Sequence, residues 1–154
     1  MRAAPRAASV WPSEPDIAPH AAGVGEARSQ HYARDRRIVK TDEFSSVFRL
    51  RPVHRTAHFV LYARSNQLNR ARLGIVAAKR FAPRAVTRNM IKRITRELFR
   101  QSDLPPIDCI VRLSKPVNSK AEPASTAKLK SALRNELTLL LRSKHTLPAS
   151  NEAR

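Results

Sequence analysis

The chain of 154 residues is poor in the residue types on which several protein classes depend. Its single cysteine, Cys109, excludes a disulfide framework and a cysteine-rich zinc module. Its three glycines, two of which stand before residue 26, leave no glycine-rich phosphate loop. No apolar run approaches the roughly 18 residues of a membrane span, and residues 1–17 lack the apolar core of a secretory signal. We therefore expect a soluble, cytoplasmic protein that does not enter a membrane.

Acidic residues are scarce as well. The chain has 12 Asp+Glu against 30 Lys+Arg, a formal net charge of +18, and residues 49–100 hold 14 Lys/Arg with a single acid, Glu97. Because an ordinary surface intersperses both signs of charge, we expect a polyanionic partner, and a nucleic acid in preference to an acidic lipid. A metal-dependent nuclease needs two or three convergent carboxylates. The sequence therefore predicts neither a metal site nor catalytic residues in the protein itself.

The composition predicts one folded domain between two tails. Residues 1–34 are rich in Ala, Pro and Arg and show no apolar periodicity, so they bury too little surface to offset their chain entropy. We expect a disordered extension over 1–34, a domain over 35–142 and a flexible tail over 143–154.

The first half of that domain predicts one helix followed by strands. Thr41 is expected to be the hydroxyl N-cap of a short amphipathic helix with acids in its first turn. Residues 57–63 and 72–79 predict two strands that pair as antiparallel neighbours across the polar turn at 66–69, and 51–56 predicts a weaker strand.

The second half predicts a helix over 83–101, a strand over 107–113 and a last helix that Ser125 or Thr126 caps. The last helix ends at residue 142 and carries a core stripe of Leu129, Leu133, Leu137, Leu140 and Leu141. The order α-β-β-(β)-α-β-α predicts an α+β fold, an α-β sandwich with a small central sheet covered by helices.

The helix over 83–101 divides into two faces when its residues are placed at about 100° each. The polar face holds Arg84, Arg88, Asn89, Lys92, Arg93, Arg96 and Arg100, and the apolar face holds Val86, Met90, Ile91, Ile94 and Leu98. Like charges at i,i+4 repel by a few tenths of a kcal/mol per pair, and here they form an unbroken ladder. A helix selected only for stability would place Glu on that ladder, so we interpret the polar face as a binding surface.

The aromatic residues near the first helix can be interpreted in two ways, as core residues or as base-stacking residues. Phe44, Phe48 and Tyr62 are core residues by default, or they stack on unpaired bases if the sheet face beside the first helix is open. Phe59 is expected in the core, and so is Cys109, which lies in an apolar strand. His54 and His58 lie in an extended segment and are interpreted as surface or hydrogen-bonded histidines.

Two segments carry a family resemblance. Residues 72–80 (RLGIVAAKR) and 84–100 (RAVTRNMIKRITRELFR) closely resemble the signature of the bacterial ribonuclease P protein family. The resemblance extends to residues 37–48 (RIVKTDEFSSVF), 59–62 (FVLY) and, less closely, 108–116. It covers about 80–105 residues and the element order.

The chain departs from the family pattern at a few positions. Met90 replaces a usual basic residue, and because it falls on the apolar face we expect little loss of phosphate contact. Arg112 and Ser114 stand where the family tends to have aliphatic residues followed by Ala-Arg. The extension before Ala33 is longer than the usual N-terminus of the family.

The resemblance implies an RNA-binding subunit of ribonuclease P, an endoribonuclease whose catalytic RNA and bound Mg²⁺ remove the 5′ leader of precursor tRNA. It implies a left-handed βαβ crossover, with the catalytic RNA and precursor tRNA as partners and no obligate protein partner. The basic helix (Arg84, Arg88, Asn89, Lys92, Arg93, Arg96, Arg100) would contact RNA, and a cleft (Phe44, Phe48, Tyr62, Lys79, Arg80) would hold the leader. The main alternative is a structural RNA-binding protein of the ribosomal type, which would have the same charge and no chemistry. A third interpretation is a DNA-architectural protein.

Overall fold

A computed structural model describes residues 32–142. The predicted extension over 1–34 and tail over 143–154 lie outside the described residues, except for residues 32–34, which belong to the described fold. The element order predicted from the sequence is confirmed. The elements are a 3₁₀ turn η1 (Arg34–Arg36), α1 (Thr41–Phe48), β1 (His54–Arg55), β2 (Phe59–Ser65), β3 (Arg72–Val76), α2 (Ala85–Gln101), β4 (Ile107–Leu113) and α3 (Ala127–Arg142).

The four strands form one mixed sheet in the order β1-β2-β4-β3. β4 runs antiparallel to β2 and parallel to β3, with Cys109 opposite both Ala63 and Leu73. The expectation that segments 57–63 and 72–79 pair directly is therefore wrong, because β4 lies between them. Six of the seven residues of β4 are buried, whereas β3 is only partly buried. A strand whose apolar run is buried on both faces takes a central place, and the less apolar strand takes the edge.

Helix α2 connects β3 to its parallel neighbour β4. Parallel neighbours cannot be joined by a tight turn, so a crossover of this length is required. The left-handed sense of this crossover stays a prediction.

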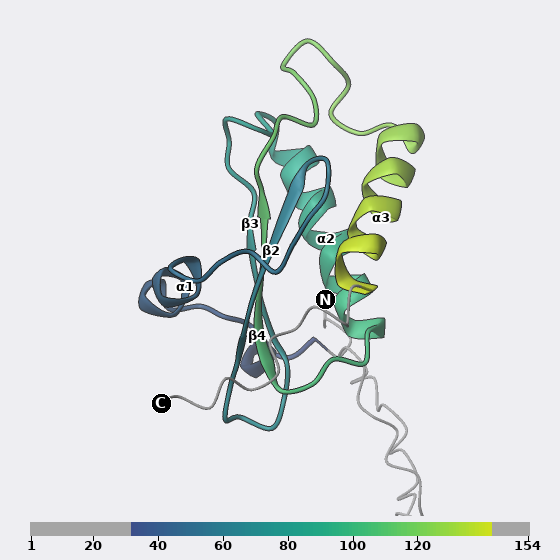
Figure 1. The fold of residues 1–154 in the computed structure, drawn as a ribbon. Helices are drawn as coiled ribbons and strands as arrows, with labels where there is room; N and C mark the ends of the chain where they lie inside the picture. The colour runs from purple at the N-terminus through teal and green to yellow at the C-terminus, as the bar shows by residue number, and fades with distance from the viewer. Residues whose placement is uncertain (1–31, 143–154) are drawn as a thin grey trace, which may run out of the picture.

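The helices are divided unequally between the two faces of the sheet. Figure 1 shows α2 and α3 on one face and α1 alone on the other. Because successive strand residues point to opposite faces, Phe59 and Leu61 join the large core under α2 and α3, while Val60 and Tyr62 join a small core under α1. The eight residues of α1 span about 12 Å, against about 23 Å for the seven residues of β4. The α1 face is therefore only partly covered.

The buried side of α2 differs from the predicted apolar face. Val86 is 57% exposed, whereas Thr87 and Thr95 are fully buried beside Ile91 and Ile94. The hydroxyl of Thr87 donates a hydrogen bond to the carbonyl of Ala124 at 2.6 Å, and that of Thr95 donates one within the helix. Because both hydroxyls are satisfied, they can be buried where α2 packs against the sheet and α3 together.

The two predicted helix caps have different outcomes. Thr41 is the first helical residue of α1 rather than its cap, and the N-cap, Lys40, makes no side-chain capping bond. The Thr126 hydroxyl does cap α3, where it accepts a hydrogen bond from the backbone N–H of Leu129 at 3.1 Å. The leucine stripe of α3 faces the core as predicted. Within residues 32–142, no helix has the length and apolar character that a membrane span requires.

Candidate nucleic-acid interface

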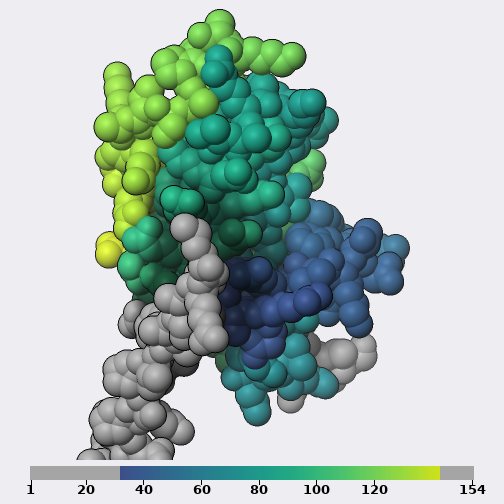
Figure 2. Space-filling view, turned by 180° about the vertical axis from the view of Figure 1, so that it is seen from behind, coloured from purple at the N-terminus to yellow at the C-terminus, as the bar shows by residue number. Residues whose placement is uncertain are grey.

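A groove of about 640 Å³ runs along the polar side of α2. Its lining consists of Tyr32, Arg37, Asn89, Lys92, Arg93, Arg96, Glu97 and Arg100. Five predicted helix residues, Asn89, Lys92, Arg93, Arg96 and Arg100, are thus brought together in one concave surface. Figure 2 shows that the start of the described chain, in dark blue, packs against the teal surface of the middle of the chain.

The groove is strongly positive. Its one acid, Glu97, is held by Arg134 of α3 at 2.7 Å, and this hydrogen bond lowers the pKa of Glu97. Within residues 32–142, the structure shows no ion pair between a carboxylate and Arg37, Lys92 or Arg96. Cations without counter-ions in a concave surface attract polyanions.

Tyr32 and Arg37 belong to this groove although they were not among the predicted site residues. The Tyr32 ring packs edge-on against Phe99 at 6.1 Å, and its hydroxyl donates a hydrogen bond to the carbonyl of Leu73 at 3.1 Å. The guanidinium groups of Arg37 and Arg96 lie 5.0 and 6.0 Å from the centre of the same ring. Burial raises the pKa of the Tyr32 hydroxyl, although the three nearby arginines oppose that shift. An aromatic residue followed by three arginines within six positions was the signal available in the sequence.

Arg84 and Arg88 lie outside the groove lining and serve the start of α2. Arg84 Nη2 donates to the carbonyl of Lys120 at 2.6 Å. Arg88 Nη1 donates to the carbonyls of Ala82 and Pro83, each at 2.8 Å. These bonds stabilise the loops around the N-terminus of α2, a structural use that a helical wheel cannot show.

A second feature lies between α1 and the sheet, where Phe44, Phe48 and Tyr62 form an aromatic cluster at the place of the predicted cleft. We call these three residues the aromatic cleft. The ring centres of Phe44 and Phe48 are 6.3 Å apart, and Phe48 meets Tyr62 edge-on at 5.2 Å. Tyr62 is 8% exposed, whereas Phe44 and Phe48 are half-buried. The three predicted residues therefore form one cluster, in which the two phenylalanines reach the surface.

Gly74 allows α1 to approach the sheet closely. A Cβ atom at this position would lie 2.6 Å from Cε1 of Phe44, so only glycine leaves space for the ring. Lys79 and Arg80, the other predicted cleft residues, are exposed in the loop after β3. The guanidinium of Arg80 packs on Phe81 at 4.5 Å rather than on a cleft ring.

The basic groove and the aromatic cleft adjoin. A smaller hollow of about 280 Å³ is lined by Arg37, Lys92 and Arg96 of the groove and also by Phe44 of the cleft. One continuous surface therefore offers cations along α2 and aromatic rings under α1, as unpaired nucleic acid requires.

A buried ion cluster fixes α1 on the sheet. Asp108 of β4 is fully buried and accepts two hydrogen bonds from Arg72, both at 2.8 Å, and one from Asn66 at 2.7 Å. Burial raises the pKa of Asp108, but these hydrogen bonds outweigh burial and hold that pKa below its ordinary value. Arg72 also donates to Glu43 of α1 at 2.9 Å. The cluster therefore positions the helix that carries the cleft phenylalanines.

The described residues do not form a metal centre. Residues 32–142 contain no group of three or more His, Cys, Asp or Glu side chains that could hold a metal ion. The Asp108 carboxylate already accepts hydrogen bonds from Arg72 and Arg64, and Glu136 accepts hydrogen bonds from Thr56 and His58. Cys109 is buried, which raises its thiol pKa to about 12. These donor sets do not fit a divalent cation.

Comparisons with known proteins identify the family. Residues 32–137 match the family model described as Ribonuclease P. The ribonuclease P protein component of Paraburkholderia xenovorans is 51% identical over 108 residues, which cover 68% of this chain and 77% of that protein. The corresponding protein of Ralstonia pickettii is 50% identical over 111 residues, 71% of this chain and 79% of that protein.

Solved structures agree with these sequence matches. The Staphylococcus aureus RNase P protein is 29% identical with a TM-score of 0.56, and the match covers 70% of this chain and 94% of that one. The Thermotoga maritima protein is 28% identical with a TM-score of 0.55, covering 70% and 96%. The chain therefore belongs to the bacterial ribonuclease P protein family, the protein components that assist RNA in the endonucleolytic 5′ processing of precursor tRNA.

Proposed function

We propose that the basic groove along α2 binds the catalytic RNA of ribonuclease P and that the aromatic cleft binds the single-stranded 5′ leader of precursor tRNA. The observation that carries the proposal is the hollow that Lys92, Arg96 and Phe44 share, because it joins the two surfaces. One RNA-binding surface can then hold catalytic RNA and leader side by side.

The groove suits a folded RNA because its cations can neutralise several phosphates at once. Each neutralised phosphate releases condensed counter-ions, so affinity rises with the number of contacts and falls with salt. Three of the groove cations on α2 are arginines, whose planar guanidinium groups bind phosphate oxygens in pairs.

The cleft suits an unpaired strand because its rings offer stacking surfaces that do not distinguish one base from another by hydrogen bonds. Stacking of a base on an aromatic ring contributes about 1–3 kcal/mol and tolerates any base. A leader differs in sequence from one tRNA precursor to the next, so recognition that tolerates any base fits this substrate. Lys79 and Arg80, exposed beyond β3, would contact phosphates of the same strand.

The protein is proposed to contribute binding and the RNA to contribute chemistry. Ribonuclease P of this family generally uses Mg²⁺, and the described side chains do not provide its ligands. Phosphates of the catalytic RNA and the substrate would therefore hold the ions, which would supply an activated water for cleavage of the leader. We expect the complex to act in the cytoplasm without a membrane or an obligate protein partner.

Reconstitution tests this proposal directly. The full chain is mixed with its cognate catalytic RNA, and leader removal is measured at a low Mg²⁺ concentration, where RNA alone is slow. We expect the protein to increase the rate and the affinity for precursor tRNA. No increase, together with tight binding to ribosomal RNA, would instead support a structural RNA-binding protein.

A further inference from the structure

Three rows of side chains cross the α1 face of the sheet. The strand register places Arg64, Asp108 and Arg72 in the first row and Tyr62, Ile110 and Gly74 in the second. The third row consists of Arg55, Val60, Arg112 and Val76. The first row holds α1 through its ion cluster, and the second lies under the aromatic rings. The third row contains two arginines, Arg55 and Arg112, and neither belongs to the ion cluster.

Arg112 of β4 reaches the aromatic cleft from this third row. Its guanidinium carbon lies 5.7 Å from the centre of the Phe48 ring, and its side chain is half-buried. A guanidinium over a ring keeps the N–H groups at its rim available for hydrogen bonds. Arg112 therefore offers donors beside the ring on which a base would stack.

The contrast with the first row shows that Arg112 does not serve the fold in the same way. Arg64 and Arg72 occupy the same face and both bind the Asp108 carboxylate, at 3.3 and 2.8 Å. Within the described part of the chain, Arg112 forms no ion pair with a carboxylate. Partial burial of a cation without a counter-ion is costly, and a bound anion would remove that cost.

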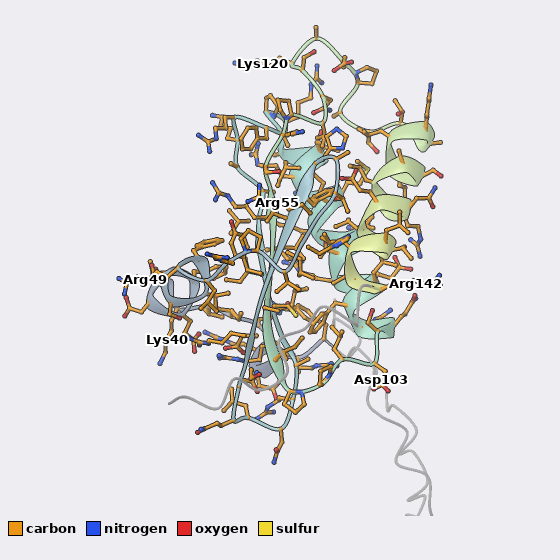
Figure 3. The ribbon with its side chains drawn as sticks, viewed as in Figure 1. Lys40, Arg49, Arg55, Asp103, Lys120 and Arg142 are labelled. Atoms are coloured by element: carbon orange, nitrogen blue, oxygen red, sulfur yellow. The ribbon has the colours of Figure 1, made fainter. Side chains whose placement is uncertain are left out.

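The neighbours of Arg112 extend the positive charge along the open part of the sheet. Arg55 of the edge strand β1, labelled in Figure 3, is exposed and stands in the same row, with Val60 between the two arginines. Adjacent strands are about 4.8 Å apart, so the two arginines stand on strands about 10 Å apart. An aromatic ring followed by spaced cations matches the base and phosphates of a single strand.

We propose that Arg112 and Phe48 form one nucleotide subsite, in which a leader base stacks on Phe48 and Arg112 binds the phosphate of that nucleotide. This inference rests on the proposed function of the cleft and names a residue at which the chain departs from the family pattern. Arg112 is then a specificity-determining residue for leader-bearing substrate. It has no part in the cleavage chemistry.

Arg112→Ile is the informative variant, because a β-branched residue suits a strand and the change leaves the residues of the ion cluster in place. The isoleucine side chain can still pack beside the Phe48 ring that Arg112 contacts. Lys128→Ala is the matched control, since it removes one exposed cation from α3 on the opposite face of the sheet. Both variants are reconstituted with the cognate RNA. Their affinities for leader-bearing precursor tRNA and for mature tRNA are then measured across a range of salt.

We expect Arg112→Ile to weaken binding of the leader-bearing substrate about tenfold, the effect of one charge-assisted contact, with little change for mature tRNA. The slope of log K against log salt should flatten by about 0.7, the value for one phosphate contact on a single strand. Lys128→Ala should change both substrates equally. Arg112→Lys, which keeps the charge, should retain the slope and lose part of the affinity.

A neutral methylphosphonate, placed at each leader position in turn, locates the contact. One position should weaken wild-type binding and leave Arg112→Ile unaffected. Two results would overturn the subsite. In the first, Arg112→Ile loses equal affinity for leader-bearing and mature tRNA. In the second, the methylphosphonate weakens binding of Arg112→Ile at every leader position at which it weakens binding of the wild type. Arg112 would then only pack against Phe48. Failure of the wild-type protein to stimulate cleavage would instead overturn the proposed function, so the two failures are distinguishable. If Arg112→Ile does not fold, Arg112→Lys and the methylphosphonate scan of the wild type still test the subsite. An unchanged affinity of Arg112→Lys for leader-bearing tRNA, or no leader position at which the methylphosphonate weakens wild-type binding, would overturn it.

Discussion

Replacement of Asp108 by Asn tests whether the ion cluster holds α1 on the sheet. The side chain is fully buried, and Arg72 donates to both of its oxygens at 2.8 Å. In Asp108→Asn, an amide NH₂ would face the guanidinium of Arg72 or the amide of Asn66, so two donors would meet. The shape of the side chain is kept, while its negative charge and one of its hydrogen-bond acceptors are lost.

The size of the effect follows from the partners that remain. Removal of one partner from a buried ion pair costs about 3–5 kcal/mol, because the other charge stays buried. Arg72 keeps Glu43 at 2.9 Å, so we expect the lower end, about 3 kcal/mol. For a domain of this size, that loss corresponds to a decrease in Tm of about 12 °C.

The effect of Asp108→Asn should depend on pH. The pKa of Asp108 is lowered from its ordinary value of 3.8, so its carboxylate stabilises the fold above about pH 4. That contribution is lost as the pH falls through the lowered pKa of the folded state. The variant has no such group to protonate, so the difference in stability between wild type and variant should narrow in acid.

Urea and thermal unfolding of the full chain, followed by circular dichroism, measure these differences. Glu97→Gln is the control, because it breaks an ion pair that is more than one-third exposed and should cost much less. A loss below about 1 kcal/mol for Asp108→Asn at neutral pH would refute the reasoning. It would show that the interactions within the cluster only offset the free energy of removing its charged groups from water.

Three further changes test the two surfaces. Lys92→Ala with Arg96→Ala should flatten the slope of log K against log salt for catalytic RNA by about 1.4–1.8, as measured by filter binding. Lys128→Ala with Arg142→Ala on α3 is the control of equal charge, because both side chains are exposed and neither lines the groove. An unchanged slope for the groove variant would exclude the groove as the binding surface. Phe48→Ala should weaken binding of leader-bearing tRNA by about 1–3 kcal/mol and binding of mature tRNA much less, as measured in a competition assay. Equal losses of affinity for both RNAs would show that Phe48 serves only to pack the core. Gly74→Ala should lower Tm because its Cβ meets the Phe44 ring, and Phe44→Leu should reduce that loss in a double-mutant cycle; additive losses would contradict the contact.

The sequence by itself determined the elements and the class of partner. Local periodicity is enough to recognise the amphipathic stripe of α3 and the apolar run of β4, whose bounds are as predicted. The scarcity of acids in residues 49–100 likewise predicts a polyanion, because net charge is a property of composition. The motif in α2 predicted the family, which the comparisons confirmed.

Only the tertiary structure decided which residues meet. β4 enters between β2 and β3 because burial on both faces of the sheet depends on all the layers, which local pattern does not show. Arg88 and Arg96 look equivalent on a wheel, yet one donates to loop carbonyls and the other lines the groove. Arg112 appeared only as an unusual residue in an apolar strand, until the register placed it beside Phe48. Contacts between residues distant in sequence depend on the packing of the whole domain, and those contacts define the proposed binding surface.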